Sequence, residues 1–407
     1  MNFLFAWRYF KAKKSTNAIN IIAWVSVLAM VLITAAFVVM LSVFNGFEGL
    51  VKSLYSSFYS DLRIEPAVGK VIRVSPAQLA ALRANGAIKA FSLQVEERAL
   101  LLNEDIQATP LLKGVDSAYT SVTSVAAHVE RGKFNLGTAD TPGIVLGRGV
   151  EYALAVDAER SVYPLMLYLF RRGGNINVID PYQAFSANPV YPSGTFYIQS
   201  DIDSKYAITN LAFMKRMMGM KSNEYSCIEM SLKRPEKATE VQQHLKAVFG
   251  KDYRILTRYE QNRSLYSVMH TEKWAIYGIL TLMLVVAAFT MIGALSMLVM
   301  EKQKDIQVLK AVGASSRLVQ RIFMSEGLLL AAIGGCSGLL LGWLICWAQI
   351  QFKLVSIQGG SFLIDYYPVK MVGTDFFIVI VTVMAVAILA SWFPSRKAAD
   401  QPVELRS

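Results

Sequence analysis

Four long uncharged stretches stand out in the pattern of polar and apolar positions. They run from Ile19 to Phe44, from Trp274 to Met300, from Gly327 to Phe352 and from Phe376 to Phe393. A helix needs about 20 apolar residues to cross the hydrocarbon core, and uncharged runs of this length exceed the core helices of soluble proteins. Since lipid cannot satisfy an open strand edge, each stretch predicts a transmembrane helix.

The first and second stretches are separated by residues 45–273, which have the composition of an ordinary water-exposed domain. The residue pattern predicts strands at 61–66, 71–74, 144–147, 195–199 and 227–232 and helices at 76–84, 148–156, 211–218 and 235–249. In the last of these helices, Ala238, Val241, Leu245 and Val248 form one apolar stripe, which is expected to be its core face. The chain is therefore expected to be a membrane protein with four transmembrane α-helices and a large α+β extracytoplasmic domain inserted between helices 1 and 2.

Several local signals refine this inserted domain. Ser75-Pro76 predicts an N-cap followed by proline at the first helical position. The polar residues 103–105 predict a hairpin between flanking strands. Residues 163–193 are expected to be irregular, either as a functional loop or as a plain connection. Two subdomains are expected, divided near residues 130–135 with a return near 225.

Charge gives the orientation. Lysine and arginine concentrate before the first stretch, between the second and third, and after the fourth. Positive charge marks cytoplasmic loops, so both termini are expected in the cytoplasm and residues 45–273 outside it. The net charge of +11 reflects this topology together with a mildly basic outer domain, and nothing in it indicates nucleic acid as a partner.

The expected segments follow from these borders. They are an amphipathic N-terminal helix at 1–18, spans at 19–44, 274–300, 327–352 and 376–393, the extracytoplasmic domain at 45–273, a cytoplasmic loop at 301–326, a short outer loop at 353–375 and a cytoplasmic tail at 394–407. The first span is too long for a signal peptide and is interpreted as a retained anchor. The aromatic residues at 3, 7 and 10 favour a helix over a disordered basic tail for 1–18.

Catalytic chemistry is not indicated. The three cysteines are Cys227, Cys336 and Cys346, so the extracytoplasmic domain has no pair for a disulfide, and Cys227 is expected to be a small buried residue rather than a nucleophile. The three histidines show no metal-ligand spacing, and the sequence contains neither G-x-x-x-x-G-K-[ST] nor G-x-S-x-G. No catalytic, cofactor or metal residue is therefore expected in this chain, and the uncharged spans argue against ion-driven transport.

The segment after the second span predicts a short amphipathic helix. Ile306, Leu309, Ala311 and Val312 are expected to share a broad apolar face, and Gly313 is placed to end the helix. Such a helix suits docking into a groove of another protein. The alternative is a charged turn whose apolar residues lie on lipid.

Four motifs carry a family resemblance. Residues 300–314, MEKQKDIQVLKAVGA, resemble the coupling helix of the MacB/FtsX-like ABC permease superfamily, and FPSRKAA at 393–399 with Pro402 is similar to its C-terminal motif. LSVFNGFE at 41–48 resembles the signature of lipoprotein-releasing (Lol) permeases, and residues 269–273 with 287–289 resemble their approach to span two. The third span repeats Gly334, Gly338 and Gly342, which predicts close helix packing within the subunit.

The resemblance implies a non-catalytic permease subunit of a type VII ABC transporter. Its implied partners are a dimer of separate ATPase subunits that bind ATP and magnesium, a second permease subunit, a triacylated lipoprotein, a periplasmic carrier and membrane lipids. The implied location is the inner membrane, and the implied function is to extract lipoproteins from its outer leaflet through mechanotransmission. The implied ATPase-coupling residues are Glu301, Lys304, Asp305, Ile306, Leu309 and Gly313.

An apolar lipoprotein site is expected at the depth of the outer leaflet on spans one and two, formed by Met40, Val43, Phe44, Phe47, Ile276 and Ile279. Ordinary helix or lipid contact is the alternative for each. Three other functions stay open: an FtsX-like regulator of cell-wall hydrolases, a MacB-like efflux permease and a membrane-anchored enzyme.

Overall fold

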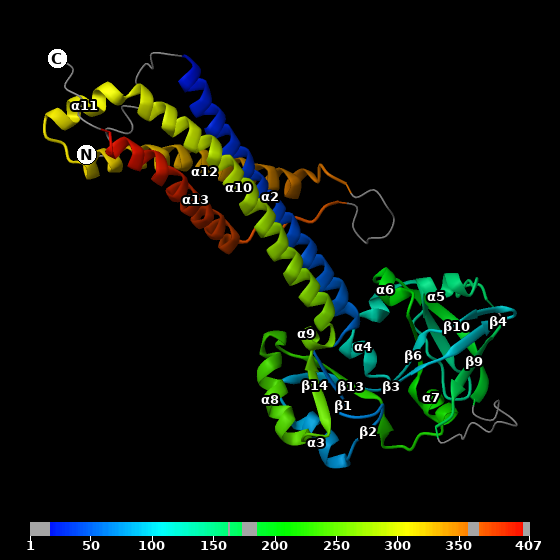
Figure 1. Cartoon of the computed structure of the whole chain (residues 1–407). Coiled ribbons are helices and arrows are strands. Elements are labelled where there is room, and N and C mark those ends of the chain that lie inside the picture. Colours follow the sequence, from blue (N-terminus) through cyan, green and yellow to red (C-terminus); the bar gives the residue numbers. More distant parts are fainter. Residues whose placement is uncertain (1–16, 162, 173–184, 357–365, 402–407) are drawn as a thin grey trace, which may run out of the picture. The chain divides into compact units, whose positions relative to one another are not determined.

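The chain forms two compact units in a computed structural model that describes residues 17–161, 163–172, 185–356 and 366–401 (Figure 1). Of the described residues, 17–50, 267–356 and 366–401 form the helical unit, and 51–161, 163–172 and 185–266 form the sheet unit. A sheet-rich domain inserted between the first and second long helices confirms the expected fold class. The expected N-terminal helix at 1–18 lies almost wholly outside the described residues.

Four helices of the described chain are long and apolar enough to cross a membrane. They are α2 (Asn17–Phe58), α10 (Arg263–Glu301), α12 (Ser316–Phe352) and α13 (Gly373–Ala399). The expected borders at 44, 273, 327 and 393 fall inside these helices, because an apolar run ends where side chains become polar while backbone hydrogen bonding continues. The short helix α11 (Gln303–Ala311) lies between α10 and α12, where a coupling helix is expected.

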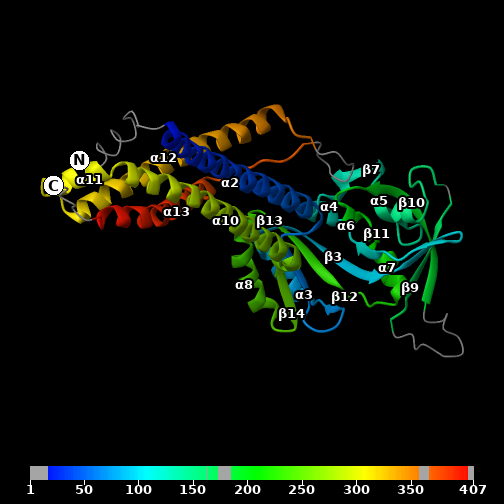
Figure 2. The ribbon, with the colours of Figure 1, turned by 45° about the horizontal axis from the view of Figure 1, so that its top comes forward.

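Side chains from all four long helices fill the core of the helical unit. Phe37, Leu284, Ala331 and Val379 are fully buried in it. Three glycines of α12 lie so close to α2 that a side chain would collide with it. A Cβ on Gly334 would lie nearest to Met30, a Cβ on Gly338 nearest to Thr34 and Val31, and a Cβ on Gly342 nearest to Val38. The predicted close packing of this glycine repeat within the subunit is confirmed, and Figure 2 shows these helices side by side.

One long mixed sheet organises the sheet unit, in the order β14-β1-β13-β3-β6-β11-β8-β10-β9-β4-β5, with β7 also paired to β10. The β11–β6 and β10–β8 pairs are parallel and the other pairs antiparallel. The strands are β1 (Leu62–Pro66), β3 (Ile88–Arg98), β4 (Leu100–Asn103), β5 (Ile106–Ala108), β6 (Leu111–Val115), β7 (Val129–Gly132), β8 (Gly143–Gly147), β9 (Leu165–Phe170), β10 (Phe185–Phe196), β11 (Tyr206–Asn210), β13 (Cys227–Leu232) and β14 (Tyr253–Thr257); β2 (Ile72–Arg73) and β12 (Glu224–Tyr225) form a separate pair.

Short helices cover this sheet. They are α3 (Pro76–Ala84), α4 (Tyr119–Val122), α5 (Arg148–Ala153), α6 (Ser200–Asp203), α7 (Leu211–Met218), α8 (Ala238–Phe249) and α9 (Arg258–Gln261), with 3₁₀ turns η1 (Val125–His128) and η3 (Pro235–Lys237). The residues of α3 and α8 pack on β1, β13 and β14, whereas α5 and α7 belong to another buried cluster with β8 and β9. Strand β3 supplies Ile88 to the first cluster and Val95 to the second, so one sheet runs through both cores.

Most of the local predictions in this unit hold. Ser75 caps α3 with a complete capping box, and β4 and β5 form the expected hairpin. In α8, Val241 and Leu245 are buried as expected, but Val248 is exposed and Phe249 takes its place in the core.

The irregular structure predicted for residues 163–193 is wrong for 165–170 and 185–193, whereas 173–184 lie outside the described residues. Strands β9 and β10 pair antiparallel there, from Leu165 to Phe170 and from Phe185 onward. Buried positions alternate with more exposed ones along β9, but apolar residues occupy both kinds of position, so the sequence does not show the alternation. Prolines 189 and 192 argued against β10, yet the strand accommodates them, with a register irregularity between Pro192 and Gly194.

Replacing Gly338 by valine should destabilise the helical unit. A Cβ at this position lies 2.6 Å from Thr34 Cβ and from the Val31 carbonyl oxygen, and overpacking costs about 1–3 kcal/mol. The matched control is Gly293→Val, where a Cβ meets no heavy atom of the described chain within 4 Å. Thermal unfolding of the full chain in detergent should show a lower Tm for Gly338→Val than for Gly293→Val; equal values would contradict this packing.

Candidate functional site

The coupling segment folds as α11, with one apolar residue buried against its own chain. Ile306 is 1% exposed and packs with Leu298, Val299, Val319, Phe323 and Ala398. On the opposite side, Val308 is 63% and Val312 84% exposed, while Leu309 is half-buried. The expected single face of Ile306, Leu309, Ala311 and Val312 is therefore wrong: residues six apart on a helix point to different sides, whereas 308 and 312 share one.

The remaining candidate coupling residues lie around this helix. Glu301 is the last residue of α10 and is half-buried; Lys304 and Asp305 are exposed in the first turn of α11, where Lys302 pairs with Asp305 at 3.2 Å. Gly313 has a φ of +99° and its N–H donates to the Lys310 carbonyl at 3.0 Å. A left-handed residue suits glycine at a helix end, so the predicted stop is confirmed.

Lys310 joins α11 to the C-terminal end of α13. Its Nζ donates to the carbonyl oxygens of Ala399 at 2.7 Å and Gln401 at 2.6 Å. Ala398, in the preceding turn, is fully buried against the cluster that holds Ile306. The C-terminal motif thus contacts α11, across 89 residues of sequence, and sequence reasoning missed this contact. Both views show α11 beside this end of α13, called here the α11 end of the bundle (Figures 1 and 2).

A polar cluster joins three helices at the opposite end of α13. The Asn45 amide donates to the Asp375 carboxylate at 2.5 Å, and Lys273 Nζ lies 2.9 Å from Asn45 Oδ1 and 3.5 Å from Asp375 Oδ1. Asn45 and Asp375 are buried. The three residues come from α2, α10 and α13, and this is called here the Asp375 end of the bundle.

The glycine beside Asn45 lets the chain pass close by. A Cβ on Gly46 would lie 2.2 Å from the Pro368 carbonyl oxygen, and the Lys370 N–H donates to the Ser42 carbonyl at 2.9 Å. Both residues of the Asn45-Gly46 motif therefore serve contacts with α13: Asn45 binds its first turn, and Gly46 leaves room for the segment that leads into it. Sequence reasoning missed Lys273 and Asp375, whose opposite charges at the ends of two spans were the available signal. It also placed Glu326 just outside span three, whereas this residue is buried inside α12.

The predicted apolar site residues flank this cluster on α2 and α10. Met40 is 47% and Ile279 60% exposed, whereas Val43, Phe44, Phe47 and Ile276 are half-buried and Ile276 packs on the bundle core. The exposed positions continue on each helix as an apolar strip: Ile21, Trp24, Val25, Leu28 and Leu32 on α2, and Leu282, Met283, Val286 and Phe289 on α10. In the single chain, this surface is open to lipid or to another apolar partner.

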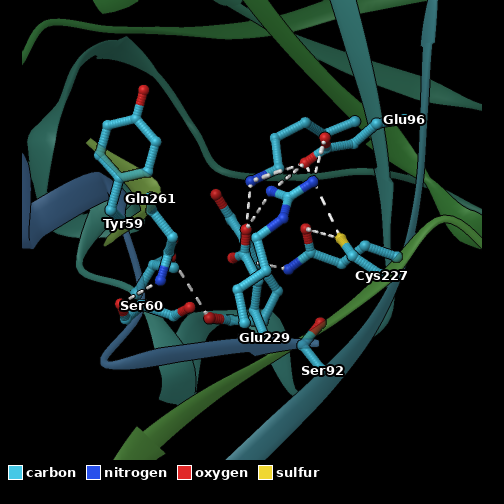
Figure 3. Close-up of polar contacts among 12 residues, drawn as sticks. Tyr59, Ser60, Ser92, Glu96, Cys227, Glu229 and Gln261 are labelled. Carbon is cyan, nitrogen blue, oxygen red and sulfur yellow. Dashed lines mark hydrogen bonds and ion pairs between the residues drawn. The ribbon is translucent and has the colours of Figure 1, made fainter. Parts of the chain in front are cut away.

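The sheet unit contains a buried ionic network (Figure 3). Arg63 pairs with Glu96 at 2.7 Å and with Glu229 at 3.2 Å, while Lys113 pairs with Glu229 at 2.9 Å. Burial raises the pKa of Glu96, but the charges of Arg63 and Lys113 outweigh it and hold that pKa at about 2. Two cations and two carboxylates thus neutralise each other across strands β1, β3, β6 and β13.

The Glu96, Cys227 and Glu229 side chains in this network lie close enough to suggest a metal site, with ligand atoms within 4.8 Å of one another. The donor set does not fit a metal, because Arg63 and Lys113 already occupy both carboxylates. Burial also raises the pKa of the Cys227 thiol well above its usual range, so the thiolate that a metal needs is disfavoured. Cys227 is buried as predicted, and the network acts structurally.

An open cavity of about 780 Å³ lies elsewhere in the sheet unit, lined by Arg131, Arg148, Glu151, Tyr197 and Asp203 among others. The Arg148 guanidinium lies over the Tyr197 ring, 4.8 Å from its centroid. Asp203 is buried and accepts the Ile198 N–H at 3.0 Å. Burial raises the pKa of this carboxyl to about 7, although the Ile198 and Gln199 N–H groups oppose the shift.

Asp203 should make the sheet unit less stable as pH rises. Its folded pKa of about 7 exceeds the unfolded value of 3.8, so between these values the unfolded chain has already released the proton that the folded chain keeps. The loss in the free energy of unfolding grows from about pH 4 to pH 7 and has an upper limit of about 4 kcal/mol. Asp203→Asn should remove it. Thermal unfolding of the full chain at pH 5 and pH 8 measures the difference, and identical pH profiles for both proteins would contradict the assignment.

Comparisons with known proteins show similarity to membrane permeases. The description "FtsX-like permease C-terminal" matches residues 277–403. The chain is 23% identical to the lipoprotein-releasing system transmembrane protein LolC of Xylella fastidiosa (strain Temecula1), over 98% of this chain and 96% of the relative. It is 25% identical to LolE of Haemophilus influenzae, over 100% and 99%, and 26% identical to LolC of Neisseria meningitidis serogroup B, over 98% of each.

Two solved structures also resemble the chain at 12% identity. They are the extracellular domain of the ABC-type transporter YknZ from Gram-positive bacteria, with a TM-score of 0.33 over 49% of this chain and 99% of that one, and the periplasmic region of MacB from Actinobacillus actinomycetemcomitans, with 0.35 over 54% and 98%. Residues 277–403 thus match the description of an FtsX-like permease C-terminal domain, and the chain is similar along nearly its whole length to LolC and LolE, which are transmembrane proteins of lipoprotein-releasing systems.

Proposed function

We propose that the chain is the permease subunit of a transporter that extracts lipoproteins from the outer leaflet of the inner membrane and passes them to a periplasmic carrier. The observation that carries this proposal is the extent of similarity: relatives named for lipoprotein release match 98% to 100% of the chain, sheet unit included. The YtrF permease of Bacillus subtilis, by contrast, matches 28% of it.

The Asp375 end of the bundle supports a lipid-anchored cargo. In the proposed orientation it lies at the outer leaflet, and both chain termini are cytoplasmic. The apolar strip with Met40, Val43, Phe44 and Phe47 on α2 and Ile276 and Ile279 on α10 offers hydrocarbon contacts for acyl chains at that depth. Each buried methylene contributes about 0.8 kcal/mol, so several acyl chains need a long apolar surface of this kind.

The α11 end supports coupling to a separate ATPase, which binds ATP and magnesium. The exposed Val308 and Val312, half-buried Leu309 and the polar Lys304 and Asp305 offer a docking face, while Glu301 and Gly313 bound the helix. Ile306 acts from behind, because it fastens the helix to the bundle. A second permease subunit, the same chain or a related one, would complete a transporter with two ATPase subunits.

The proposed function is tested by copurification and release. The full chain, solubilised from its own membranes, should bring down an ATPase subunit and triacylated lipoprotein. In proteoliposomes, ATP should then transfer that lipoprotein to a soluble periplasmic carrier. Recovery of a peptidoglycan hydrolase without lipoprotein would instead favour an FtsX-like regulator, and ATP-driven efflux of a small molecule a MacB-like one.

Val308→Asp should break the docking of the ATPase. A charge buried in a docked interface costs about 2 kcal/mol or more, which weakens binding roughly thirtyfold. We expect the ATPase to be lost on purification and cargo-stimulated hydrolysis to fall accordingly, with membrane insertion unchanged. Val248→Asp, on the exposed face of α8, is the matched control and should behave as wild type. Normal copurification of Val308→Asp would remove this face from the interface.

A further inference from the structure

Helix α13 is fastened at both of its ends to the parts of the helical unit that the proposed function uses. Lys310 fixes its C-terminal end to α11, and Asp375 fixes its N-terminal end to α2 and α10. We propose that α13 relays movement of the coupling helix to the apolar surface on α2 and α10, and that Lys310 and Asp375 are the positioning residues of this relay. The proposal deepens the proposed function and rests on it.

At the α11 end, the contact combines charge with packing. A lysine ammonium has three donors and no acceptor, and the last carbonyls of a helix have no partner within the helix. Lys310 supplies two of these donors to the Ala399 and Gln401 carbonyls. A cation here also interacts favourably with the negative end of the helix dipole. Since Ile306 and Ala398 are both buried in one cluster, α11 cannot shift without moving this end of α13 or losing these contacts.

Between its ends, α13 is packed along its length. Val379, Val383, Ala387 and Ala390 are buried in the bundle core. The Tyr277 and Thr382 hydroxyls share a 2.6 Å hydrogen bond that ties the helix to α10. A helix of 27 residues spans about 40 Å at 1.5 Å per residue, which is enough to join the two ends of a membrane bundle.

One interruption lies near the α11 end. Pro394 removes a backbone hydrogen bond inside α13. Pro394, Ser395 and Ala398 are nevertheless buried, so packing holds this last turn to the bundle. The relay therefore depends on the side-chain packing of this turn as well as on a continuous helix.

At the Asp375 end, one carboxylate meets donors from both helices that carry the apolar site. Asn45 on α2 and Lys273 on α10 both approach Asp375, and Lys273 also approaches Asn45. Asp375 lies in the first turn of α13, where a negative charge is favoured. A shift of α13 along its axis must break or drag these contacts. It would thereby change the spacing of α2 and α10 beside Met40 and Ile279.

The relay predicts that damage at one end is felt at the other. The full chain, with the subunits that copurify, is placed in lipid nanodiscs, and amide hydrogen exchange is followed by mass spectrometry in residues 367–375. Lys310→Met should speed exchange there roughly threefold or more, the range of long-range couplings, and Asp375→Asn should do the same locally. Lys310→Arg, which keeps donors for the carbonyls, should restore the wild-type rate.

Two controls separate a relay from general loosening. Lys397→Met removes the same charge from an exposed position in the last turn of α13 and should leave exchange in 367–375 unchanged. Residues 340–350 of α12 should keep their wild-type exchange in Lys310→Met. The relay is overturned if Lys310→Met leaves residues 367–375 unaffected, or if 340–350 loosen equally. The measurement needs neither cargo nor ATP, so a wild-type complex that releases no lipoprotein would refute the proposed function and leave this result standing.

Discussion

The sheet unit depends on one contact between the segment that enters it and the segment that leaves it. Arg258 pairs with Asp61 at 2.7 Å and donates to the Tyr59 carbonyl, while Gln261 donates to the Ser60 carbonyl (Figure 3). Asp61 follows the end of α2 and Arg258 precedes the start of α10, so the contact joins the segments through which the chain enters and leaves the sheet. Asp61 also accepts the Leu232 N–H. A domain closed in this way can be inserted between two spans, because its ends leave together.

The helical unit follows a related rule, in which polar contacts gather at the ends of apolar helices. Placing a charge inside the lipid bilayer has a large free-energy cost. The three-helix cluster at Asp375 and the Lys310 contact accordingly both lie where a span ends. The interior of the bundle is joined instead by small residues and by hydroxyls such as those of Tyr277 and Thr382. The long apolar stretches of these helices thus stay uncharged, while polar contacts at the helix ends hold the helices in register.

The sequence predicts the parts of this structure that depend on local chemistry. Long apolar runs identified four spanning helices, Ser75 identified a capped helix, and the glycine repeat of α12 identified a close packing surface. The parts it missed depend on residues far apart. Asn45 meets Asp375 across 330 positions, and no local pattern encodes such a partner. The face of α11 was misassigned for the same reason: whether Ile306 or Val312 is buried depends on α10, α12 and α13, which pack against it, and not on α11 itself.

The same dependence on distant partners explains why the family motifs lie where they do. Asn45-Gly46, the coupling segment and the C-terminal motif are separate in the sequence, yet in the helical unit they meet at the two ends of one helix. Gly46 admits the segment that leads into α13, Asn45 holds its first turn, and Ile306 with Lys310 holds its last. Motifs that were interpreted one by one, as a lipid-facing signature and a docking helix, are thus also the points at which α13 is attached. Helices with long uncharged stretches gain a fixed alignment from such attachments, because hydrogen bonds and ion pairs are directional whereas the hydrophobic effect is not.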